Sequence, residues 1–530
     1  MKHHTIARRH QRHLLNALKA AHFHPLYWVV SFIRCKWIAN SALFILDFRY
    51  RSGCFRLTNI GSLKKAREIA TAAFMEVPAY KEYCGTKICP KEWTAFPLSD
   101  KKNYILAYPD SQILAPNASE MHTIFRSSGA TGKSVYWPQL KSAHRLSSWA
   151  LQIYLENTFQ IHQKRTLAIV GLSLGSWVGG DQMSSILKQC ALQTPYSFSV
   201  FSPGNRHDEI LEIAKSKYSC VDQLLLIACP SAIGNLKQLA TSQGKDLIFD
   251  KFKYLVLGES FAEELRVSLS GKSHHPCMFS MYGSADTGLL GVESQGSVAL
   301  RQLICTSPHL RAEFGIENEV PLFFHNCAPE AFLEVINHEL YVTRWQGVPI
   351  VRYNLHDQVH LFDWKLLREM ALRLSTTDPL QKSLQRKIFF GSPYLPPLIA
   401  VYGRMDKCLV LCGTNITAGM LEFAVRSSQL QPYLTGLFNA KIQYADNRQF
   451  LALDLELREG QAPTREVDQI IYACLVQKLG ETQPEFEEDW RHIYSRWGTD
   501  PEARIIRINY LQWPALSATL TTKIKHLSIS

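Results

Sequence analysis

The chain has 530 residues, of which 46% are hydrophobic and 20% are charged, and its formal net charge is +12. This length corresponds to roughly three to four domains or subdomains, and the composition excludes a disordered chain. The charge is concentrated at one end, because residues 1–58 contain ten Lys or Arg and one acidic residue. That segment accounts for +9, so the other 472 residues carry only +3 and do not form a generally basic protein.

Residues 1–58 are expected to form a basic helical extension that packs on the body of the protein. The apolar stretch 26–48 is broken by Arg34 and Lys36, and its longest uncharged run, residues 37–46, is too short for a bilayer, which takes about 20 apolar residues. The alternative is an interfacial helix with three aromatic side chains in an anionic membrane surface, namely Trp28, Phe32 and Trp37. No nucleic-acid-binding motif accompanies the charge, so no nucleic acid is expected as a partner. The sequence predicts a cytoplasmic protein, with peripheral contact at the inner face of the membrane as the open alternative.

The thirteen cysteines include no CxxC pair and are interpreted as reduced, mostly buried thiols. Three groups are candidates for a zinc site: Cys408 with Cys412, the His and Cys residues of 274–277, and His325 with Cys327. None of these spacings matches a common structural zinc site, so we expect no zinc.

The first structural pattern in chain order is a helix expected at residues 62–85. Beyond about residue 120, short apolar runs alternate with amphipathic segments. The strand-like runs are 167–171, 223–228 and 254–257, and the helical patterns between them include 208–216 and 231–239. This alternation predicts an α/β fold in which a large N-terminal domain is built of βα subdomains with mostly parallel sheets.

The second half of the chain is patterned differently. Residues 340–362 indicate a β-rich, more antiparallel region, and residues 363–395 are a charged, loosely patterned insertion. After about residue 404 a smaller α+β unit is expected, with strands near 409–411 and 450–457 and a helix near 466–478.

The first chemical motif is FRSSGATGKS at residues 125–134. A strand-like entry leads into small hydroxylated residues, two glycines and Lys133, so that backbone N–H groups, hydroxyls and one positive charge can close on an anion. The Walker A pattern requires glycine where Ser127 stands, so that match fails. Taken alone, the loop has an ordinary polar turn as its alternative.

The segment SSGATGKS resembles the phosphate loop of adenylate-forming enzymes, particularly the phenylacetate–coenzyme A ligase-like branch. The resemblance covers roughly residues 60–530. It implies a loop that holds the β- and γ-phosphates of ATP while a carboxylate attacks the α-phosphate. The residues that it assigns to this task are Ser127, Ser128, Gly129, Thr131, Gly132 and Lys133.

Two further motifs resemble the nucleotide site of the same family. YLVLGES at residues 254–260 is similar to the strand-Gly-Glu turn that borders the adenine. MYGSADTG at residues 281–288 is similar to a Tyr-Gly-x-Thr-Glu motif, in which the ring stacks on adenine and the acid ligates Mg²⁺. Asp286 replaces the usual Glu as the catalytic metal ligand, and Ala285 replaces the Thr. The residues assigned to the nucleotide are Gly258, Glu259, Tyr282, Gly283 and Ser284.

VPIVRYNLHD at residues 348–357 resembles a P-x-x-R-Y-x-x-x-D motif. Its last residue, Asp357, is implied to accept hydrogen bonds from both ribose hydroxyls, a task that suits two acceptor oxygens. His356 stands where the family has glycine. Arg352 is a candidate for a structural ion pair inside the domain.

GRMDK at residues 403–407, followed by GTN and Glu422, resembles a G-R-x-D … G-x-N … E block. It implies that Arg404 reaches the ribose region and that Asp406 is the hinge of a mobile small domain. A plain hairpin turn is the alternative for the GTN segment. The predicted division is a basic extension at 1–58, a large ATP- and acid-binding domain at 59–403, a hinge at 404–407 and a small mobile domain at 408–530.

The segment TTKIKH near the C-terminus resembles a G-K-x-x-R-like element. Its lysine is implied to contact the substrate carboxylate and the α-phosphate, which makes Lys523 the predicted catalytic lysine. Lys525 and a solvated, functionless tail are the alternatives, and His526 stands where arginine is usual.

The resemblance implies a ligase that uses ATP and Mg²⁺ to convert a small-molecule carboxylic acid into an acyl-adenylate, and then transfers the acyl group to a thiol, usually coenzyme A. The acid pocket is expected at residues 172–180 opposite Tyr282, with Trp177 and Gly179 suited to an aryl or fatty acyl group. Trp177 as a core residue is the alternative. An amine or an acyl carrier protein as acceptor, and a non-catalytic adapter or membrane-docking protein, remain open. No oligomeric state is predicted.

Overall fold

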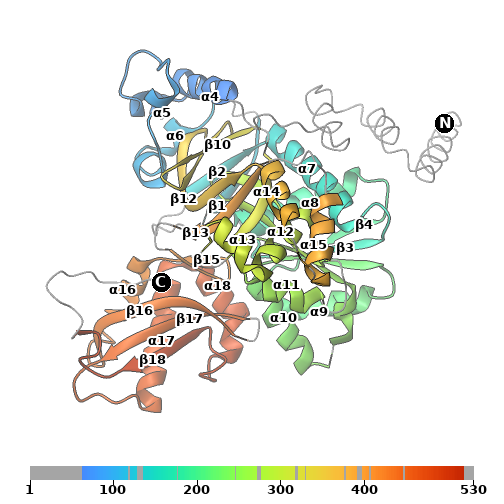
Figure 1. Cartoon of the computed structure of the whole chain (residues 1–530). Coiled ribbons are helices and arrows are strands. Elements are labelled where there is room, and N and C mark those ends of the chain that lie inside the picture. The colour runs from blue at the N-terminus through green and yellow to red at the C-terminus, as the bar shows by residue number, and fades with distance from the viewer. Residues whose placement is uncertain are drawn as a thin grey trace, which may run out of the picture.

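The computed structural model describes residues 63–116, 120–127, 135–175, 177–244, 246–270, 276–316, 320–328, 330–374, 376, 378–390, 397–404, 408–445 and 448–517. Figure 1 shows the path of the whole chain. The predicted basic extension, loop residues 128–134, the hinge residue Asp406 and the lysines Lys523 and Lys525 lie outside the described residues.

The chain begins its described part with two helices where the sequence predicted one. These are α4 (Leu63–Glu76) and α5 (Pro78–Tyr83), with Val77 between them. Pro78 occupies the first turn of α5, where it needs no backbone N–H, and it ends α4 because proline cannot continue a helix. The single helix expected at 62–85 is therefore wrong in this detail. Short elements follow, namely η1 (Trp93–Ala95), η2 (Lys101–Ile105) and α6 (Asp110–Ile113).

An 11-stranded sheet with the order β10-β11-β12-β13-β9-β8-β7-β6-β5-β3-β4 is the centre of the large unit, residues 63–404. One half of it is parallel. The parallel strands are β3 (Thr166–Gly171), β4 (Phe198–Phe201), β5 (Gln223–Ala228), β6 (Phe252–Val256) and β7 (Met278–Ser284). Helix α7 (Lys141–Phe159) precedes β3. The helices that follow between the strands include η4 (Val178–Gln182), α8 (Met183–Gln193), α9 (His207–Lys217), α10 (Pro230–Ser242) and η5 (Asp246–Lys251).

Helices cover both faces of this parallel half. Leu224 and Leu226 of β5 share a hydrophobic cluster with side chains of α9 and α10. Leu225 and Ile227 of the same strand share another cluster with side chains of α7 and α8. Every residue of β3 and β5 is buried for this reason, as continuous apolar runs predict. The predicted βα units and α/β fold class are confirmed.

The other half of the sheet is antiparallel and confirms the predicted β-rich region. Its strands are β8 (Gly288–Val292), β9 (Leu322–Asn326), β10 (Ala331–Ile336), β11 (Glu339–Arg344), β12 (Ile350–Phe362) and β13 (Leu398–Arg404). Strand β12 is long and irregular, with positive φ angles at Arg352 and His356.

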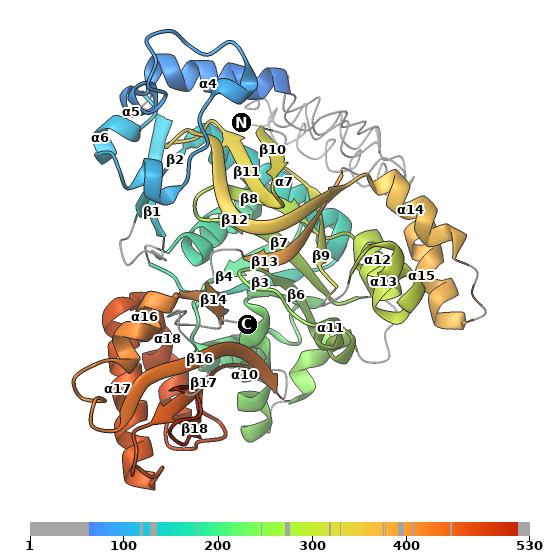
Figure 2. The same ribbon diagram turned by 60° about the vertical axis from the view of Figure 1, so that its left-hand side comes forward.

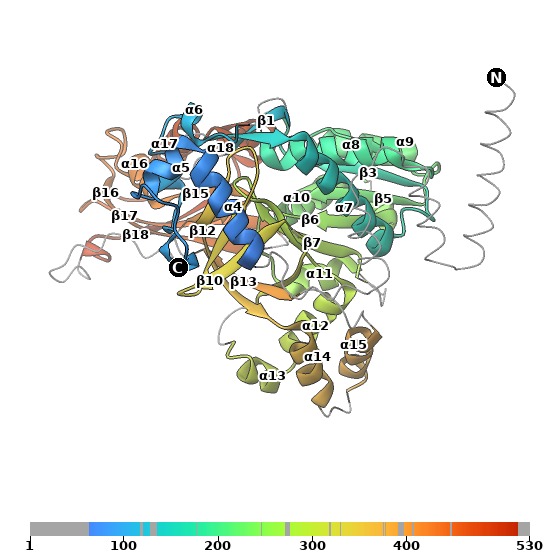
Figure 3. The same cartoon turned by 90° about the horizontal axis from the view of Figure 1, so that it is seen from above.

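The predicted insertion at 363–395 contains two helices instead of a loosely patterned segment. These are α14 (Trp364–Arg373) and α15 (Pro379–Phe390), which share a hydrophobic cluster with α12 (Gln295–Thr306) and α13 (Pro308–Glu313). Figure 3 shows these four helices at one end of the molecule, while α11 (Glu263–Ser270) lies nearer the sheet.

Residues 408–517, here called the C-terminal unit, have a hydrophobic core of their own, drawn from residues 409–506. Its strands are β14 (Leu409–Leu411), β15 (Thr414–Ile416), β16 (Leu434–Ala445), β17 (Arg448–Leu457) and β18 (Ile506–Leu511). Its helices are α16 (Ala418–Val425), α17 (Arg465–Thr482), α18 (Pro484–His492) and η6 (Tyr494–Trp497). The strands and the helix predicted there are confirmed. Figure 2 shows the unit beside the large sheet, with α10 of the large unit next to β16 and β17. In the described part of the chain, every helix is too short or too polar to cross a bilayer.

Candidate functional site

The predicted phosphate loop joins two paired strands. β1 (Met121–Ser127) and β2 (Val135–Leu140) are antiparallel, and Ser127 faces Val135 across the ladder. Ser127 is buried, and its Oγ accepts a hydrogen bond from Lys101 Nζ at 3.1 Å. Lys101 therefore adds a cation at the base of the loop. It belongs to no motif, and its position at the start of η2 gave no sequence signal.

Tyr282 and Asp357, which come from separate motifs, are in direct contact. The hydroxyl of Tyr282 donates a hydrogen bond to Asp357 Oδ2 at 2.5 Å. The Tyr282 ring stacks on Phe324 of β9, with 5.5 Å between ring centroids. Asp357 faces Arg404 in the register between β12 and β13. The predicted adenine-binding and ribose-binding residues thus meet at the centre of the sheet.

Asp286 lies in the turn between β7 and β8. Side chains from β12 and from the segment that precedes β12 hold this turn. The hydroxyl of Tyr353 donates to Asp286 Oδ2 at 2.5 Å, and Gln346 Nε2 donates to the backbone carbonyl of Asp286 at 2.6 Å. In the same turn, the hydroxyls of Ser284 and Thr287 are 2.9 Å apart. The predicted metal ligand is therefore held in a fixed orientation by Tyr353, a motif residue for which the sequence suggested no role.

The turn at Gly258 and Glu259 lies against the C-terminal unit. Gly258 has a φ of 95°, and a Cβ atom there would meet Cys229 Sγ and the Cα atom of Gly413. Glu259 Oε1 accepts a hydrogen bond from the backbone N–H of Ser231 at 2.6 Å, at the beginning of α10. Burial raises the pKa of Glu259 to about 7.

Trp177, predicted as a wall of the acid pocket, is 5% exposed. Its indole Nε1 donates to Glu488 Oε2 at 3.0 Å, and the guanidinium of Arg126 lies 4.2 Å from its ring. A Cβ atom on Gly179 would meet no atom within 4 Å, whereas one on Gly180 would lie 1.9 Å from the carbonyl oxygen of Ser173. Trp177 is thus held by β1 and α18, whereas Tyr282 is held by β9 and β12.

Arg352 forms the structural ion pair that the sequence suggested, with its Nε 3.0 Å from Glu334 Oε1. His356 has a φ of 59°, a region that favours glycine, the residue that the family has at this position. Its Nδ1 is 3.2 Å from Glu339 Oε1, and its Nε2 is 3.9 Å from Asp100 Oδ2.

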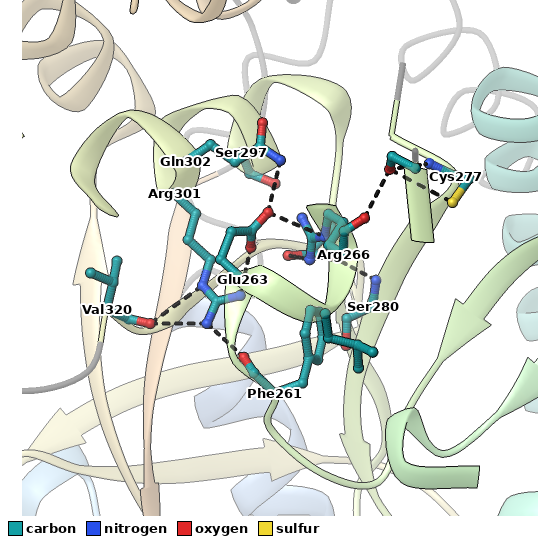
Figure 4. A network of polar contacts seen from close by, with 12 residues as sticks. Phe261, Glu263, Arg266, Cys277, Ser280, Ser297, Arg301, Gln302 and Val320 are labelled. Carbon is teal, nitrogen blue, oxygen red and sulfur yellow. Dashed lines mark hydrogen bonds and ion pairs between the residues drawn. The ribbon is translucent and has the colours of Figure 1, made fainter. Parts of the chain in front are cut away.

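A buried network of charges behind the site was not predicted (Figure 4). Arg301 Nη1 is 2.7 Å from Glu263 Oε2, and Arg266 Nη2 is 2.8 Å from Glu293 Oε2. Arg301 also donates to the carbonyl of Phe261, and Glu293 accepts from the backbone N–H of Ser280. The network therefore contacts the backbone two residues after Glu259 and two residues before Tyr282. Its residues fit no motif of the sequence analysis.

No protein-family model and no curated protein matches this sequence. Solved structures do match. The structure of 2-hydroxyisobutyryl-CoA ligase in complex with 2-HIB-AMP and CoA in the thioesterification state is 13% identical, with 88% of each chain covered and a TM-score of 0.56. The same ligase in the postadenylation state is 11% identical, with 88% of each chain covered and a TM-score of 0.46. The acyl acid amido synthetase AtGH3.15 in complex with 2,4-DB is 12% identical, with 88% of this chain and 92% of that chain covered and a TM-score of 0.40. The first likeness shows that this chain has the fold of that ligase.

Proposed function

We propose that this protein is an ATP-dependent ligase that adenylates a carboxylic acid and transfers the acyl group to a thiol, as coenzyme A ligases of the phenylacetate type do. One observation carries the proposal. The tyrosine and aspartate of two distant motifs, Tyr282 and Asp357, are hydrogen-bonded at the centre of the sheet. The fold supports it, since the 2-hydroxyisobutyryl-CoA ligase structure of similar fold is a complex with an acyl-adenylate and CoA.

The first half-reaction needs positioning more than acid–base chemistry. A carboxylate is ionised at pH 7, and one of its oxygens attacks the α-phosphorus while the bond to the bridging oxygen breaks and pyrophosphate leaves. The protein must align these groups and stabilise the negative charge on the phosphates. In the proposal, Lys523 and loop residues 127–133 do this. Asp357 and Arg404 hold the ribose, and Tyr282 stacks on the adenine.

The surroundings of Asp286 fit Mg²⁺. A hard cation prefers carboxylate oxygens. Tyr353 holds Oδ2 of Asp286, while Oδ1 accepts no hydrogen bond from a described residue. Asp286 would bind the ion through this oxygen, and the bound ion would neutralise phosphate charge.

In the second half-reaction the thiol attacks the carbonyl carbon of the acyl-adenylate, and AMP leaves. The proposed hinge is Asp406 within residues 404–407, between an acid-binding domain that ends at 403 and a mobile domain that begins at 408. Trp177, Gly179 and Tyr282 would line a pocket for an aryl or fatty acyl group. An amine or a carrier protein as acceptor would change this step alone.

A non-catalytic, nucleotide-free adapter is the second candidate. The observation in its favour is that the carboxylates of Asp286 and Asp357 each hold a tyrosine hydroxyl of the same chain, so each already has a partner without a ligand. Ala285 and His526, which depart from the family pattern, point the same way.

Exchange of labelled pyrophosphate into ATP, measured with a panel of aryl and fatty acids, tests the proposal. Exchange with at least one acid, reduced by orders of magnitude in Lys523→Ala but not in Lys525→Ala, is the expected result. ATP-dependent thermal stabilisation without exchange would indicate a nucleotide-binding protein that activates none of these acids. The absence of both exchange and stabilisation by ATP would overturn the ligase and favour the nucleotide-free adapter.

A further inference from the structure

Helix α18 of the C-terminal unit contacts two loops of the large unit through the carboxylate of Asp489. Asp489 Oδ1 accepts hydrogen bonds from Asn205 Nδ2 at 2.5 Å and from Ser173 Oγ at 3.2 Å. Asn205 follows β4 and Ser173 follows β3. The other oxygen, Oδ2, accepts from Thr414 of the C-terminal unit at 3.5 Å. One buried carboxylate thus ties the loop after β3, the loop after β4 and β15 together.

The neighbouring residue, Glu488, extends this contact to the predicted acid pocket. Its Oε2 accepts a hydrogen bond from the indole N–H of Trp177. The guanidinium of Arg126 lies over the ring of the same Trp177. Arg126 precedes Ser127 at the end of β1. A line of side chains therefore runs from α18 through Trp177 to the strand that enters the predicted phosphate loop.

The polar groups at this contact are of a kind that allows α18 to separate from the large unit. The donors to Asp489 are neutral, so no opposite charge offsets the loss of hydration of its carboxylate. In the described part of the chain, the titratable groups that interact with Asp489 are Glu488, Cys229, Cys412 and Tyr494, all acids. The two units have separate hydrophobic clusters, so polar contacts such as these have a large share in holding α18 against the large unit.

We propose that Glu488 and Asp489 are positioning residues with which the C-terminal unit completes the wall of the acid pocket, so that residues 172–180 are fixed only while α18 is docked. This inference rests on the proposed function, which places the acid there. Because the proposed hinge motion would dock α18 in one half-reaction and release it in the other, loss of the contact should affect the two half-reactions unequally.

The test compares Glu488→Ala with Glu487→Ala, its neighbour on the exposed side of α18, which pairs with Arg491. Glu488→Gln, which keeps an acceptor for the indole N–H, serves as the conservative rescue. Pyrophosphate exchange reports the adenylation step, and thioester formation from preformed acyl-adenylate reports the transfer step. We expect Glu488→Ala to change the ratio of the two rates about tenfold, the effect of losing one hydrogen bond to a charged group. Glu487→Ala should leave the ratio unchanged, and Glu488→Gln should restore most of it. An unchanged ratio in Glu488→Ala would overturn the inference.

Hydrogen exchange of the backbone provides a readout that does not depend on catalysis. In Glu488→Ala, the amides of residues 172–180 should exchange about tenfold faster than in the wild-type chain, with no change in β5. Unchanged protection of 172–180 would contradict the coupling even if the protein adenylates acids. Faster exchange there, in a protein that activates no acid, would support the coupling and refute the proposed function alone.

Discussion

Two of the regions that contain buried carboxylates stabilise these groups in different ways. Behind the site, Glu263 and Glu293 are each paired with an arginine inside one unit. Between the two units, Asp489 is equally well buried but is held by amide and hydroxyl donors. Ion pairs in a low-dielectric interior are expensive to break, whereas a carboxylate with neutral donors gains little from its burial. The comparison indicates a permanent connection inside the large unit, and it supports the proposal that the connection between the units is reversible.

The largest expected effect comes from breaking the permanent connection. Glu293→Ala should lower the free energy of unfolding by about 3–5 kcal/mol, because Arg266 would stay buried without its hydrogen-bonded partner and would keep only the longer contact to Glu263, at 3.5 Å. Chemical denaturation measures this. The double variant Arg266→Met with Glu293→Leu should lose less than the single variant, since both charges are removed together. Equal losses would mean that the pair itself, and not the unpaired charge, matters.

The pH dependence of docking should follow Asp489. Burial raises the pKa of its carboxyl to about 7 from a usual value of 3.8, so the docked state binds the proton more tightly than the undocked one. Docking is therefore most favourable below 3.8 and weakens as the pH rises from 3.8 to about 7. Hydrogen exchange of α18, corrected for intrinsic rates, should show this loss of protection.

Asp489→Asn is the control for this pH effect. It should reduce the dependence without removing it, because the pKa of Glu259 is also raised by burial and acts with the same sign. A pH dependence identical to that of the wild-type chain would show that Asp489 is not the titrating group.

The smallest effect should come from removing a single donor at the joint. Trp177→Phe keeps an aromatic ring beside Arg126 but loses the N–H that Glu488 accepts. A loss of about 1 kcal/mol in the local stability of α18 is expected, as for one hydrogen bond. Hydrogen exchange measures it against Trp513→Phe, at an exposed position in the C-terminal unit, which should change nothing. An equal effect of both variants would contradict a role for the indole N–H.

The features that the sequence predicted well are those recorded in local patterns. Strands β3 and β5 are continuous apolar runs because helices cover both faces, and a run of that kind needs no knowledge of the partners. The break at Pro78 was missed, although proline ends a preceding helix and is a local signal of the same kind. The helices of residues 364–390 were missed because their apolar faces meet α12, a partner that the segment itself does not reveal.

The candidate site divides in the same manner. Motif spacing singled out Tyr282, Asp286 and Asp357, and the fold brings the first and last together. Motif spacing could not identify Asn205. This residue meets Asp489, 284 residues further along the chain, only because a separate unit docks there. Arg266 and Glu293 were missed since charged side chains are usually solvated, and only the folded chain shows that they are buried.

The close approach of Gly413 to Cys229 offers control over the arrangement of the two units. A Cβ atom at Gly413 would lie 2.7 Å from the Cys229 sulfur, closer than atoms can pack, and its φ of 88° disfavours any other residue. A single added methyl group at Gly413 would push the two units apart at a point next to Thr414, which donates to Asp489 of α18. Gly413→Ala should therefore favour the proposed undocked arrangement of the C-terminal unit. Crystallography or solution scattering could then observe that arrangement without any ligand.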